Sequence, residues 1–592
     1  MVLLVALALG AATCDAAGEA PATTDPAPTT ASRDPAPTAA PVRAQPRGAI
    51  PDASPAPTRI AVTPTAPTPT ATPSSAVAID RAALVAFYHA TGGPTWEFNT
   101  NWLSDAPLGQ WHGVVTDASG RAIELRLFNN GLRGELPPEV GNLAKLRVLE
   151  LRANQLDGEI PAALSNLILL QELWLDNNQL QGEIPPELGN FDNLRVLQLQ
   201  GNQLRGEIPA ALGDLLQLEE LWLDLNQLQG EIPPQLGNLA NLRQLVLSAN
   251  QLNGPIPPDL GRLGRLQALS LARNQLSGAI PPELGNLSQL RSLTLASNQF
   301  QGTIPPELGN LSQLQGLWLD HNQLHGTFRA ALLSLTDLRE LDLSHNQFSG
   351  EIPAELSRLA NLDRLDLAHN QFSGTIPPEV GNLGNLFWLS LAGNQLGGAI
   401  PSALGELAKL RSLDLSNNEL SGEFPTALTR LATLDWLSLA GNQLSGSIPS
   451  ALGELHQLHV LDLTNNQLGG EIPAALSHLA NLRSLLLAGN QFNGSMPLGL
   501  DRLHNLKVLN LSDNQLSGTI PPALGSLATL EWLGLSNNQF RGEIPPAFGR
   551  FSNLESLWLG GSNQLTGCIP ERLQDVENND LAELGLPFCG GS

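Results

Sequence analysis

The sequence predicts an α/β-type repeat solenoid of about nineteen turns with a parallel β-sheet along one side. Asparagine recurs every 24 residues from Asn130 to Asn538, eighteen times without a break. Asn563 follows after a step of 25, because LWLGGSNQL holds one extra residue. The repeated unit reads LxxLxxLxLxxNQLxGxIPxxLGNL. The 592 residues include 56 glycines and only 4% aromatic residues, a bias that also favours a regular array over ordinary domains.

The leucine spacing predicts one short strand in each turn. The leucines lie too close together for one face of a helix, whereas LxL places alternate side chains on the inner side of a strand. One turn cannot bury its leucines alone, but stacked turns form a continuous core. Parallel strands about 4.8 Å apart then give a curved sheet roughly 90 Å long.

The asparagine column follows from this geometry. The chain must bend sharply after each strand, which leaves backbone N–H and C=O groups inside the turn. A buried asparagine amide both donates to and accepts from such groups. We therefore expect a structural role for this column, and we expect the glycine and proline of LxGxIP to form a turn away from the main sheet.

The repeated unit resembles the plant-type leucine-rich repeat, as in ectodomains of plant receptor-like kinases, receptor-like proteins and polygalacturonase-inhibiting proteins. The resemblance covers the array that we assign to residues 123–566. It implies a right-handed, twisted superhelix whose concave strand face and flanks bind peptides, proteins or glycan-related ligands without catalysis. No kinase domain, membrane span or inserted segment interrupts the array.

Residues 80–122 resemble the N-terminal cap of such arrays, in which Asp80 is expected to cap a helix. Three tryptophans are expected to cover the leucines of the first turn: Trp96, Trp102 and Trp111. Plant caps carry cysteines around the WxGV element, whereas WHGV here has none. The cap is thus most similar to cysteine-poor versions in bacteria and algae.

Residues 567–592 resemble the matching C-terminal cap, and they contain Cys568 and Cys589. Two cysteines that enclose a short loop at the chain end predict a disulfide, which fits an oxidising compartment. Two buried free thiols are the alternative.

The N-terminal region has no core-forming pattern. Residues 1–14 are predicted to be a signal peptide, because VLLVALALGAAT is apolar but too short to span a bilayer. Cys14 resembles the lipidated cysteine of bacterial lipoproteins, and cleavage with secretion is the alternative. Residues 15–79 are rich in proline, threonine and alanine, which predicts a disordered stalk or a simple linker.

Charge and motifs exclude several functions. The formal net charge of −25 repels phosphate backbones, so nucleic acid is not an expected partner. The chain has no HExxH, GxSxG, Walker A or dinucleotide-binding motif and no Cys-His spacing typical of zinc. We therefore predict no catalysis, no cofactor and no metal, and contact with a membrane only through the lipid anchor that Cys14 would carry.

Residues six, four, two and one before each asparagine are expected to face the concave surface. Over the eighteen regular turns these positions hold 13 acidic and 4 basic residues, so the face is predicted to be acidic. The candidate ligand-binding acids are Glu172, Asp176, Glu220, Asp224, Asp320, Asp342 and Asp366. The candidate tryptophans are Trp174, Trp222, Trp318, Trp388, Trp436 and Trp532.

An exposed tryptophan offers a rigid surface to a sugar ring or an apolar side chain. The tryptophan spacing is also consistent with tandem duplication, because two WLSLAGNQL blocks lie 48 residues apart, and with packing of the rings over the sheet. A histidine column, His321, His345 and His369, is either a pH-sensitive or metal-binding patch or a tolerated edge position.

The sequence therefore predicts an extracytoplasmic recognition protein, secreted or surface-anchored, that binds a protein or peptide through its concave face. A cell-wall or polysaccharide binder, such as an adhesin or a glycosidase inhibitor, is the first alternative. A structural surface-layer protein without a specific ligand is the second. The ligand and the oligomeric state are not predicted.

Overall fold

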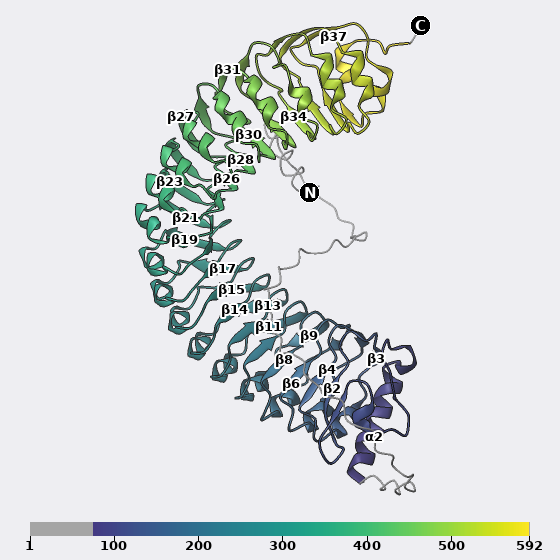
Figure 1. The fold of residues 1–592 in the computed structure, drawn as a ribbon. Coiled ribbons are helices and arrows are strands. Elements are labelled where there is room, and N and C mark those ends of the chain that lie inside the picture. The colour runs from purple at the N-terminus through teal and green to yellow at the C-terminus, as the bar shows by residue number, and fades with distance from the viewer. Residues whose placement is uncertain (1–74, 591–592) are drawn as a thin grey trace, which may run out of the picture. The chain divides into compact units, whose positions relative to one another are not determined.

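The computed structural model describes residues 75–590, which form a curved solenoid (Figure 1). Each turn contains a strand of the main sheet, a bend, a second strand on the flank and a short 3-10 helix. The predicted repeat solenoid with a parallel sheet is thus confirmed. The predicted signal peptide, Cys14 and the linker up to residue 74 lie outside the described residues.

The main sheet has 21 strands. In each three-residue strand of the repeats, the middle leucine is buried, and the first and third residues face away from the core. β1 is antiparallel to β2, and all later neighbours pair in parallel, with leucine opposite leucine as far as β38. In the last pair, Leu557 of β38 lies opposite Asn579 of β40. The strands are β1 Val114–Thr116, β2 Ala122–Arg126, β4 Val148–Glu150, β6 Glu172–Trp174, β8 Val196–Gln198, β10 Glu220–Trp222, β12 Gln244–Val246, β14 Ala268–Ser270, β16 Ser292–Thr294, β18 Gly316–Trp318, β20 Glu340–Asp342, β22 Arg364–Asp366, β24 Trp388–Ser390, β26 Ser412–Asp414, β28 Trp436–Ser438, β30 Val460–Asp462, β32 Ser484–Leu486, β34 Val508–Asn510, β36 Trp532–Gly534, β38 Ser556–Trp558 and β40 Asn578–Asn579.

The flank carries a second, interrupted set of parallel strands, one 12-stranded sheet and three smaller ones. These strands are β3 Arg133–Glu135, β5 Gln155–Asp157, β7 Gln181–Gly182, β9 Gln203–Glu207, β11 Gln227–Glu231, β13 Gln251–Gly254, β15 Gln275–Gly278, β17 Gln299–Gly302, β19 Gln323–Thr327, β21 Gln347–Glu351, β23 Gln371–Thr375, β25 Gln395–Ala399, β27 Glu419–Glu423, β29 Gln443–Ser445, β31 Gly469–Glu471, β33 Gln491–Asn493, β35 Ser517–Gly518, β37 Gln539–Glu543 and β39 Gln564–Thr566.

Within residues 75–590, the remaining elements are one α-helix, α2 Ser75–Ala90, and short 3-10 helices. The 3-10 helices often start at the second proline of the IPP segment, because its φ fits a first helical position. The 3-10 helices are η1 Gly93–Thr95, η2 Leu108–Gln110, η3 Pro138–Asn142, η4 Ala162–Asn166, η5 Pro186–Asn190, η6 Ala210–Asp214, η7 Pro234–Asn238, η8 Pro258–Arg262, η9 Pro282–Asn286, η10 Pro306–Asn310, η11 Ala330–Ser334, η12 Ala354–Arg358, η13 Pro378–Asn382, η14 Ser402–Glu406, η15 Thr426–Arg430, η16 Ser450–Glu454, η17 Ala474–His478, η18 Leu500–Arg502, η19 Pro522–Ser526, η20 Pro546–Arg550, η21 Glu571–Asp575 and η22 Leu581–Leu584. None of the helices within residues 75–590 is long and apolar enough to cross a membrane.

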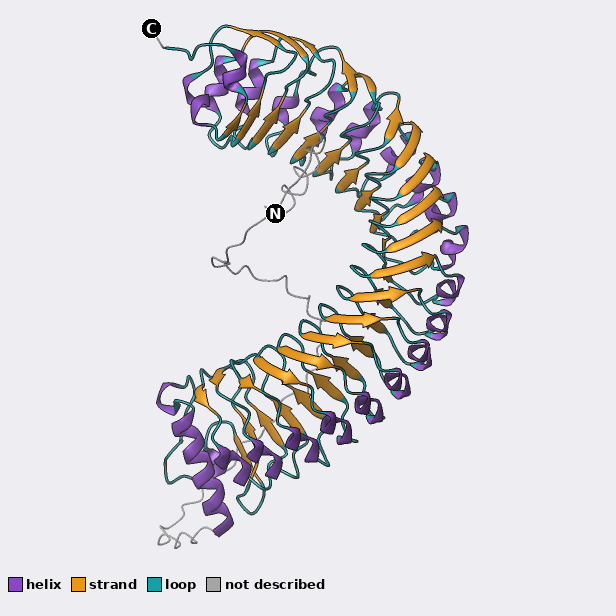
Figure 2. Cartoon of the chain, turned by 180° about the vertical axis from the view of Figure 1, so that it is seen from behind, coloured by secondary structure: helices purple, strands orange, loops and turns teal. Residues whose placement is uncertain are grey.

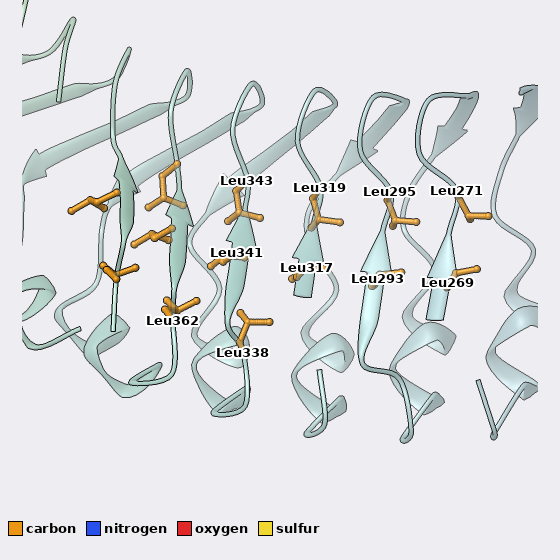
Figure 3. Packing of buried hydrophobic residues seen from close by; sticks show 14 of the residues in the cluster. Leu269, Leu271, Leu293, Leu295, Leu317, Leu319, Leu338, Leu341, Leu343 and Leu362 are labelled. Carbon is orange, nitrogen blue, oxygen red and sulfur yellow. The ribbon is translucent and has the colours of Figure 1, made fainter. Parts of the chain in front are cut away.

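The core lies between the main sheet and the 3-10 helices. The main sheet lines the inner, concave side of the arc and the helices follow its outer side (Figure 2). Leucines such as Leu293, Leu295, Leu317 and Leu319 stack from turn to turn between the two layers and are fully buried (Figure 3). The residues on either side of each strand leucine are therefore directed to the concave surface.

The asparagine column holds adjacent turns together. The Asn226 amide Nδ2 donates to Leu199 O of the preceding turn at 3.0 Å and to Leu223 O at 3.1 Å. Its Oδ1 accepts the Leu204 N–H at 3.0 Å. The same bonds recur along the column as far as Asn563, so the predicted structural role is confirmed. Asn130, the first member, instead binds the Phe98 backbone of the N-terminal cap.

The N-terminal cap differs from two expectations. Helix α2 begins at Ser75, so the assignment of residues 75–79 to the linker is wrong. Asp80 does not cap the helix, because it lies within α2, fully buried, and forms an ion pair with Arg121 at 2.8 Å. Its carboxylate also accepts the Ala122 N–H at the start of β2. A buried carboxylate needs such partners, and here they fasten α2 to the sheet.

The three cap tryptophans form an aromatic cluster over the start of the array. Trp96 and Trp102 meet edge to face at 4.9 Å, and Trp102 lies 5.0 Å from Trp111. Phe87 of α2 packs against Trp96 at 5.7 Å. All of these rings are buried, as expected of a cap that shields the first leucines.

At the other end, Cys568 and Cys589 form the predicted disulfide. The Cys589 N–H donates to Ile569 O at 2.7 Å, so the backbone next to the two cysteines is also joined by a hydrogen bond. Asp580 is buried and accepts the N–H groups of Leu559 and Gly560, the two that follow β38. The C-terminal cap thus supplies the acceptor that a further turn would otherwise provide.

Replacement of a column asparagine is expected to destabilise the array. In Asn346→Ala, the Leu324 N–H loses its acceptor. The carbonyls of Leu319 and Leu343 each lose one of the two asparagine amides that donate to them. The free energy of unfolding should fall by about 2 to 4 kcal/mol in urea denaturation. Gln347→Ala, in the exposed next position, is the matched control, and equal losses in the two variants would contradict the structural role.

Loss of the disulfide is expected to loosen only the C-terminal cap. A cross-link that encloses about 20 residues contributes about 3 kcal/mol. In Cys568→Ser/Cys589→Ser, limited proteolysis should cut first within residues 567–590 while the repeats stay intact. Cleavage that begins in the middle of the array would contradict this expectation.

Candidate functional site

The predicted concave residues occupy the expected rows of the main sheet. Trp174, Trp222 and Trp318 are the last residues of β6, β10 and β18. Trp388, Trp436 and Trp532 are the first residues of β24, β28 and β36. All six side chains are half-buried, so each ring lies partly covered on the concave face. Their roles as ligand contacts stay predictions.

Two of these rings lie over glycines of their own strands. A Cβ atom at Gly316 would lie 2.0 Å from the Trp318 ring, and one at Gly534 would lie 2.3 Å from the Trp532 ring. The glycines therefore make room for the indoles, which lie back along the sheet. This arrangement was not predicted from the sequence, although the triplets GLW and WLG carry its signal.

The middle of the sheet holds an ion-pair cluster on β20, β22 and β24. Arg364 contacts Asp366 at 2.9 Å and Asp342 at 3.6 Å, and its guanidinium lies 4.4 Å from the centre of the Trp388 ring. The Trp388 Nε1–H donates to Asp366 Oδ2 at 3.3 Å. These candidate residues are thus largely paired with one another. Burial first, and then the neighbouring Asp342, raise the pKa of Asp366 to about 6.

A second acidic and aromatic cluster lies on β6, β8 and β10, and we call it the β6–β10 cluster. It comprises Glu172, Trp174, Asp176, Gln198, Gln200, Glu220, Trp222 and Asp224. The register places Gln198 directly between Trp174 and Trp222. Backbone bonds from Asn177 to Gln200 and from Gly201 to Asp224 place Asp176, Gln200 and Asp224 on consecutive turns.

The indole N–H groups of the two tryptophans in the β6–β10 cluster differ in whether they have a hydrogen-bond acceptor. The Trp174 Nε1–H donates to Glu172 Oε2 at 3.3 Å. The equivalent carboxylate, Glu220, instead accepts from Gln198 Nε2 at 3.2 Å. The Trp222 Nε1–H therefore finds no acceptor within residues 75–590, although it is buried.

The β6–β10 cluster contains most of the unpaired buried polar atoms. Among residues 75–590, six buried side-chain polar atoms lack a hydrogen-bond partner, and four of them belong to this cluster. They are Asp176 Oδ1, Gln200 Oε1, Trp222 Nε1 and Asp224 Oδ1. An unpaired buried polar atom costs roughly 1 to 3 kcal/mol, so four in one place make this cluster a candidate binding site.

Burial disfavours the charged form of both aspartates in the cluster. Burial raises the pKa of Asp224 to about 6, and the charge of Asp176 adds to this rise while its own backbone N–H opposes it. Burial also raises the pKa of Asp176, against the hydrogen bond from Asn177 and the charge of Arg152. A positive group placed between the two carboxylates would offset this cost.

A cation and two rings border the cluster at its N-terminal side. The Arg152 guanidinium lies 5.2 Å from the centre of the Trp174 ring and 5.5 Å from that of Phe128. Arg152 also contacts Glu150 at 2.9 Å. Gln198, Gln200 and Phe128 are not among the predicted site residues, because the sequence singles out only acids and tryptophans in the concave rows.

The histidine column lies at the edge of the concave face. The rings of His321 and His345 stack at 4.1 Å, and those of His345 and His369 at 4.3 Å. His321 Nδ1 lies 3.1 Å from Asp320 Oδ2. Partial burial and the adjacent histidines lower the pKa of His345 to about 4. Nowhere in residues 75–590 do three or more His, Cys, Asp or Glu side chains form a group suited to a metal ion.

Family comparisons identify the repeats directly. A model described as "Leucine-rich repeat region" matches residues 234–351. Models of single or paired leucine-rich repeats match residues 384–444 and 499–540, and six further segments: 145–167, 169–191, 193–215, 217–239, 361–383 and 457–479.

Solved structures of plant receptors are similar over most of their length. The plant peptide hormone receptor RGFR1 in complex with RGF2 is 33% identical, with a TM-score of 0.69, over 79% of this chain and 85% of that chain. The Arabidopsis receptor kinase HAESA in complex with the peptide hormone IDA and the co-receptor SERK1 is 31% identical, with a TM-score of 0.68, over 84% and 92%.

Curated relatives match only in part. A probable inactive receptor kinase of Arabidopsis thaliana, RLK902, is 38% identical over 91 residues, which are 15% of this chain and 13% of that protein. A second probable inactive receptor kinase of the same species is 40% identical over 87 residues, 14% and 13% respectively. The matches thus span about an eighth of the curated relatives' length.

Removal of the Asp224 charge is expected to stabilise the protein at neutral pH. Because the folded-state pKa, about 6, lies above the ordinary value of 3.8, the aspartate contributes stability below pH 3.8 that is lost as the pH rises through 6. Asp224→Asn should therefore raise the free energy of unfolding at pH 7 by about 1 to 2 kcal/mol, with no gain at pH 4.

The measurement is urea denaturation of both proteins between pH 4 and 7. Asp157→Asn, at an exposed position on the flank, is the control and should leave the pH dependence unchanged. A loss of stability in Asp224→Asn at pH 7 would contradict the view that the buried charge of Asp224 destabilises the folded protein.

Proposed function

Since this chain belongs to the plant-type leucine-rich repeat family, we propose that it is a non-catalytic recognition protein that binds a protein or peptide. The proposed binding surface is the concave face of the main sheet, and its centre is the β6–β10 cluster. The surrounding repeats then act as a rigid support that keeps the rows of side chains in register.

One observation carries this proposal: four unpaired buried polar atoms gather at a single place on the described part of the sheet. A partner that supplied a donor and an acceptor there would recover their hydrogen bonds. The half-buried rings of Trp174 and Trp222 on both sides of Gln198 provide apolar contact area next to these polar atoms.

The similar receptors support the class of ligand. RGFR1 and HAESA were solved in complex with peptides, RGF2 and IDA. We propose the same class of ligand for this chain, in an extracytoplasmic location, secreted or attached by a lipid at Cys14. The Cys568–Cys589 disulfide supports an oxidising compartment.

A polysaccharide binder is the second candidate, and the rings of Trp318 and Trp532 favour it. Because these indoles lie over glycines along the sheet, each offers a ring face on which a sugar could stack. Such binding would depend little on salt, whereas binding of a basic peptide to the acidic face would weaken at high salt.

Selection from a random-peptide display library against the full chain tests the proposal, with a glycan array in parallel. Trp222→Ala should weaken a selected peptide about tenfold or more, because it removes a central aromatic contact. Trp532→Ala, in β36 far along the sheet, should bind like the unchanged protein. Binding to glycans alone, or equal losses in both variants, would contradict the proposal.

A further inference from the structure

We propose that the β6–β10 cluster is a subsite for the guanidinium group of an arginine in the ligand. This inference rests on the proposed function and specifies the chemistry that the concave face selects. The same sheet carries two acidic and aromatic clusters, which differ in whether they contain a cation.

The cluster on β20, β22 and β24 contains its own cation. There the Arg364 guanidinium lies beside two carboxylates from adjacent turns, Asp342 and Asp366, and over the face of Trp388. Charge-assisted bonds to carboxylates and stacking on an indole are the two interactions that favour arginine over other cations. In this sheet, therefore, a guanidinium satisfies such an arrangement.

The β6–β10 cluster has the acceptors and the rings, but its eight residues include no basic one. Asp176 is only 5% exposed, and its Oδ1 has no partner within the described part of the chain. Asp224 Oδ1 and Gln200 Oε1 are also unpaired there, and all three atoms are acceptors on consecutive turns. The position equivalent to Arg364 in the middle turn is Val196, which brings no charge.

The number of the acceptors suits a guanidinium. Asp176 and Asp224 lie two turns apart, roughly 10 Å along the sheet, and Gln200 lies between them. A guanidinium has five N–H donors in one plane, so it can bond to Gln200 and to a neighbouring aspartate at once. An ammonium group is smaller and cannot stack on an indole in the same way.

Access to these acceptors is from the concave side. Asp224 and Gln200 are half-buried, not enclosed, so a side chain can reach them from solvent. Rotation about the Cβ–Cγ bond of an aspartate exchanges its two oxygens, which brings a covered Oδ1 to the surface.

The local charge also favours a cation. Glu172 and Glu220 add two further carboxylates at the start of β6 and β10. The basic residue at the border of the cluster, Arg152, is paired with Glu150 and lies over the Trp174 ring. The remaining unpaired atom of the cluster, Trp222 Nε1, is a donor. An arginine residue in a peptide supplies both needs, because its guanidinium donates and its backbone carbonyl accepts. A neutral sugar supplies no cation.

The test begins with peptides selected from a random display library against the full chain. Arginine should be enriched at one position of the selected sequences. Replacement of that arginine by citrulline, which keeps the shape but not the charge, should weaken binding about tenfold or more, and lysine should restore only part of it.

Protein variants then locate the contact. Asp224→Asn and Asp176→Asn should each weaken the arginine peptide about tenfold and leave the citrulline peptide unchanged. Asp414→Asn, which removes the same charge from the concave face at β26, is the matched control and should bind both peptides as before.

The failures of the two proposals are distinguishable. Selected peptides that need Trp222 but show no preference for arginine would overturn the subsite and leave the proposed function intact. The same holds if Asp224→Asn and Asp414→Asn weaken binding equally, because the effect would then be one of general charge. If the library yields no binding peptide at all, the proposed function fails and the subsite fails with it.

Discussion

The hydrogen bonds of the column asparagines are the constraint on which the rest of the structure depends. Each bend after a main-sheet strand turns three backbone groups toward the interior, where water cannot reach them. One amide such as that of Asn226 satisfies all three, and it does so across two adjacent turns. The bonds therefore fix the register between turns as well as the shape of each bend.

The register between strands aligns equivalent residues of successive repeats into one surface. Because the strand leucines of successive repeats lie opposite one another, the residues on both sides of them form straight rows across the sheet. A side chain in one turn then has defined neighbours in the turns before and after. Gln198 lies between Trp174 and Trp222 for this reason alone, since 48 residues of chain separate the two rings.

The sequence was sufficient to predict the core and the rows, but not the pairing within them. Leucine and asparagine positions are set by burial inside each turn, so the 24-residue period reveals them. Whether Glu220 accepts from Trp222 or from Gln198 depends on side-chain lengths in a different turn, which no local pattern contains. The predicted capping role of Asp80 is wrong because α2 begins at Ser75 and Asp80 lies inside it. The ion pair that Asp80 forms instead joins it to Arg121, 41 residues away, which no local pattern contains.

The column of hydrogen bonds must end at both ends of the array. At each end, the cap supplies the hydrogen-bonding groups that a neighbouring turn would supply. Asn130 binds the backbone of Phe98 as if the cap were a preceding turn, and Asp580 accepts two N–H groups as a following turn would. A turn without such a partner would present free donors, acceptors and leucines to solvent. Such an end is complementary to the opposite end of a second molecule, so the caps are also chain terminators that keep the solenoid from growing into a filament.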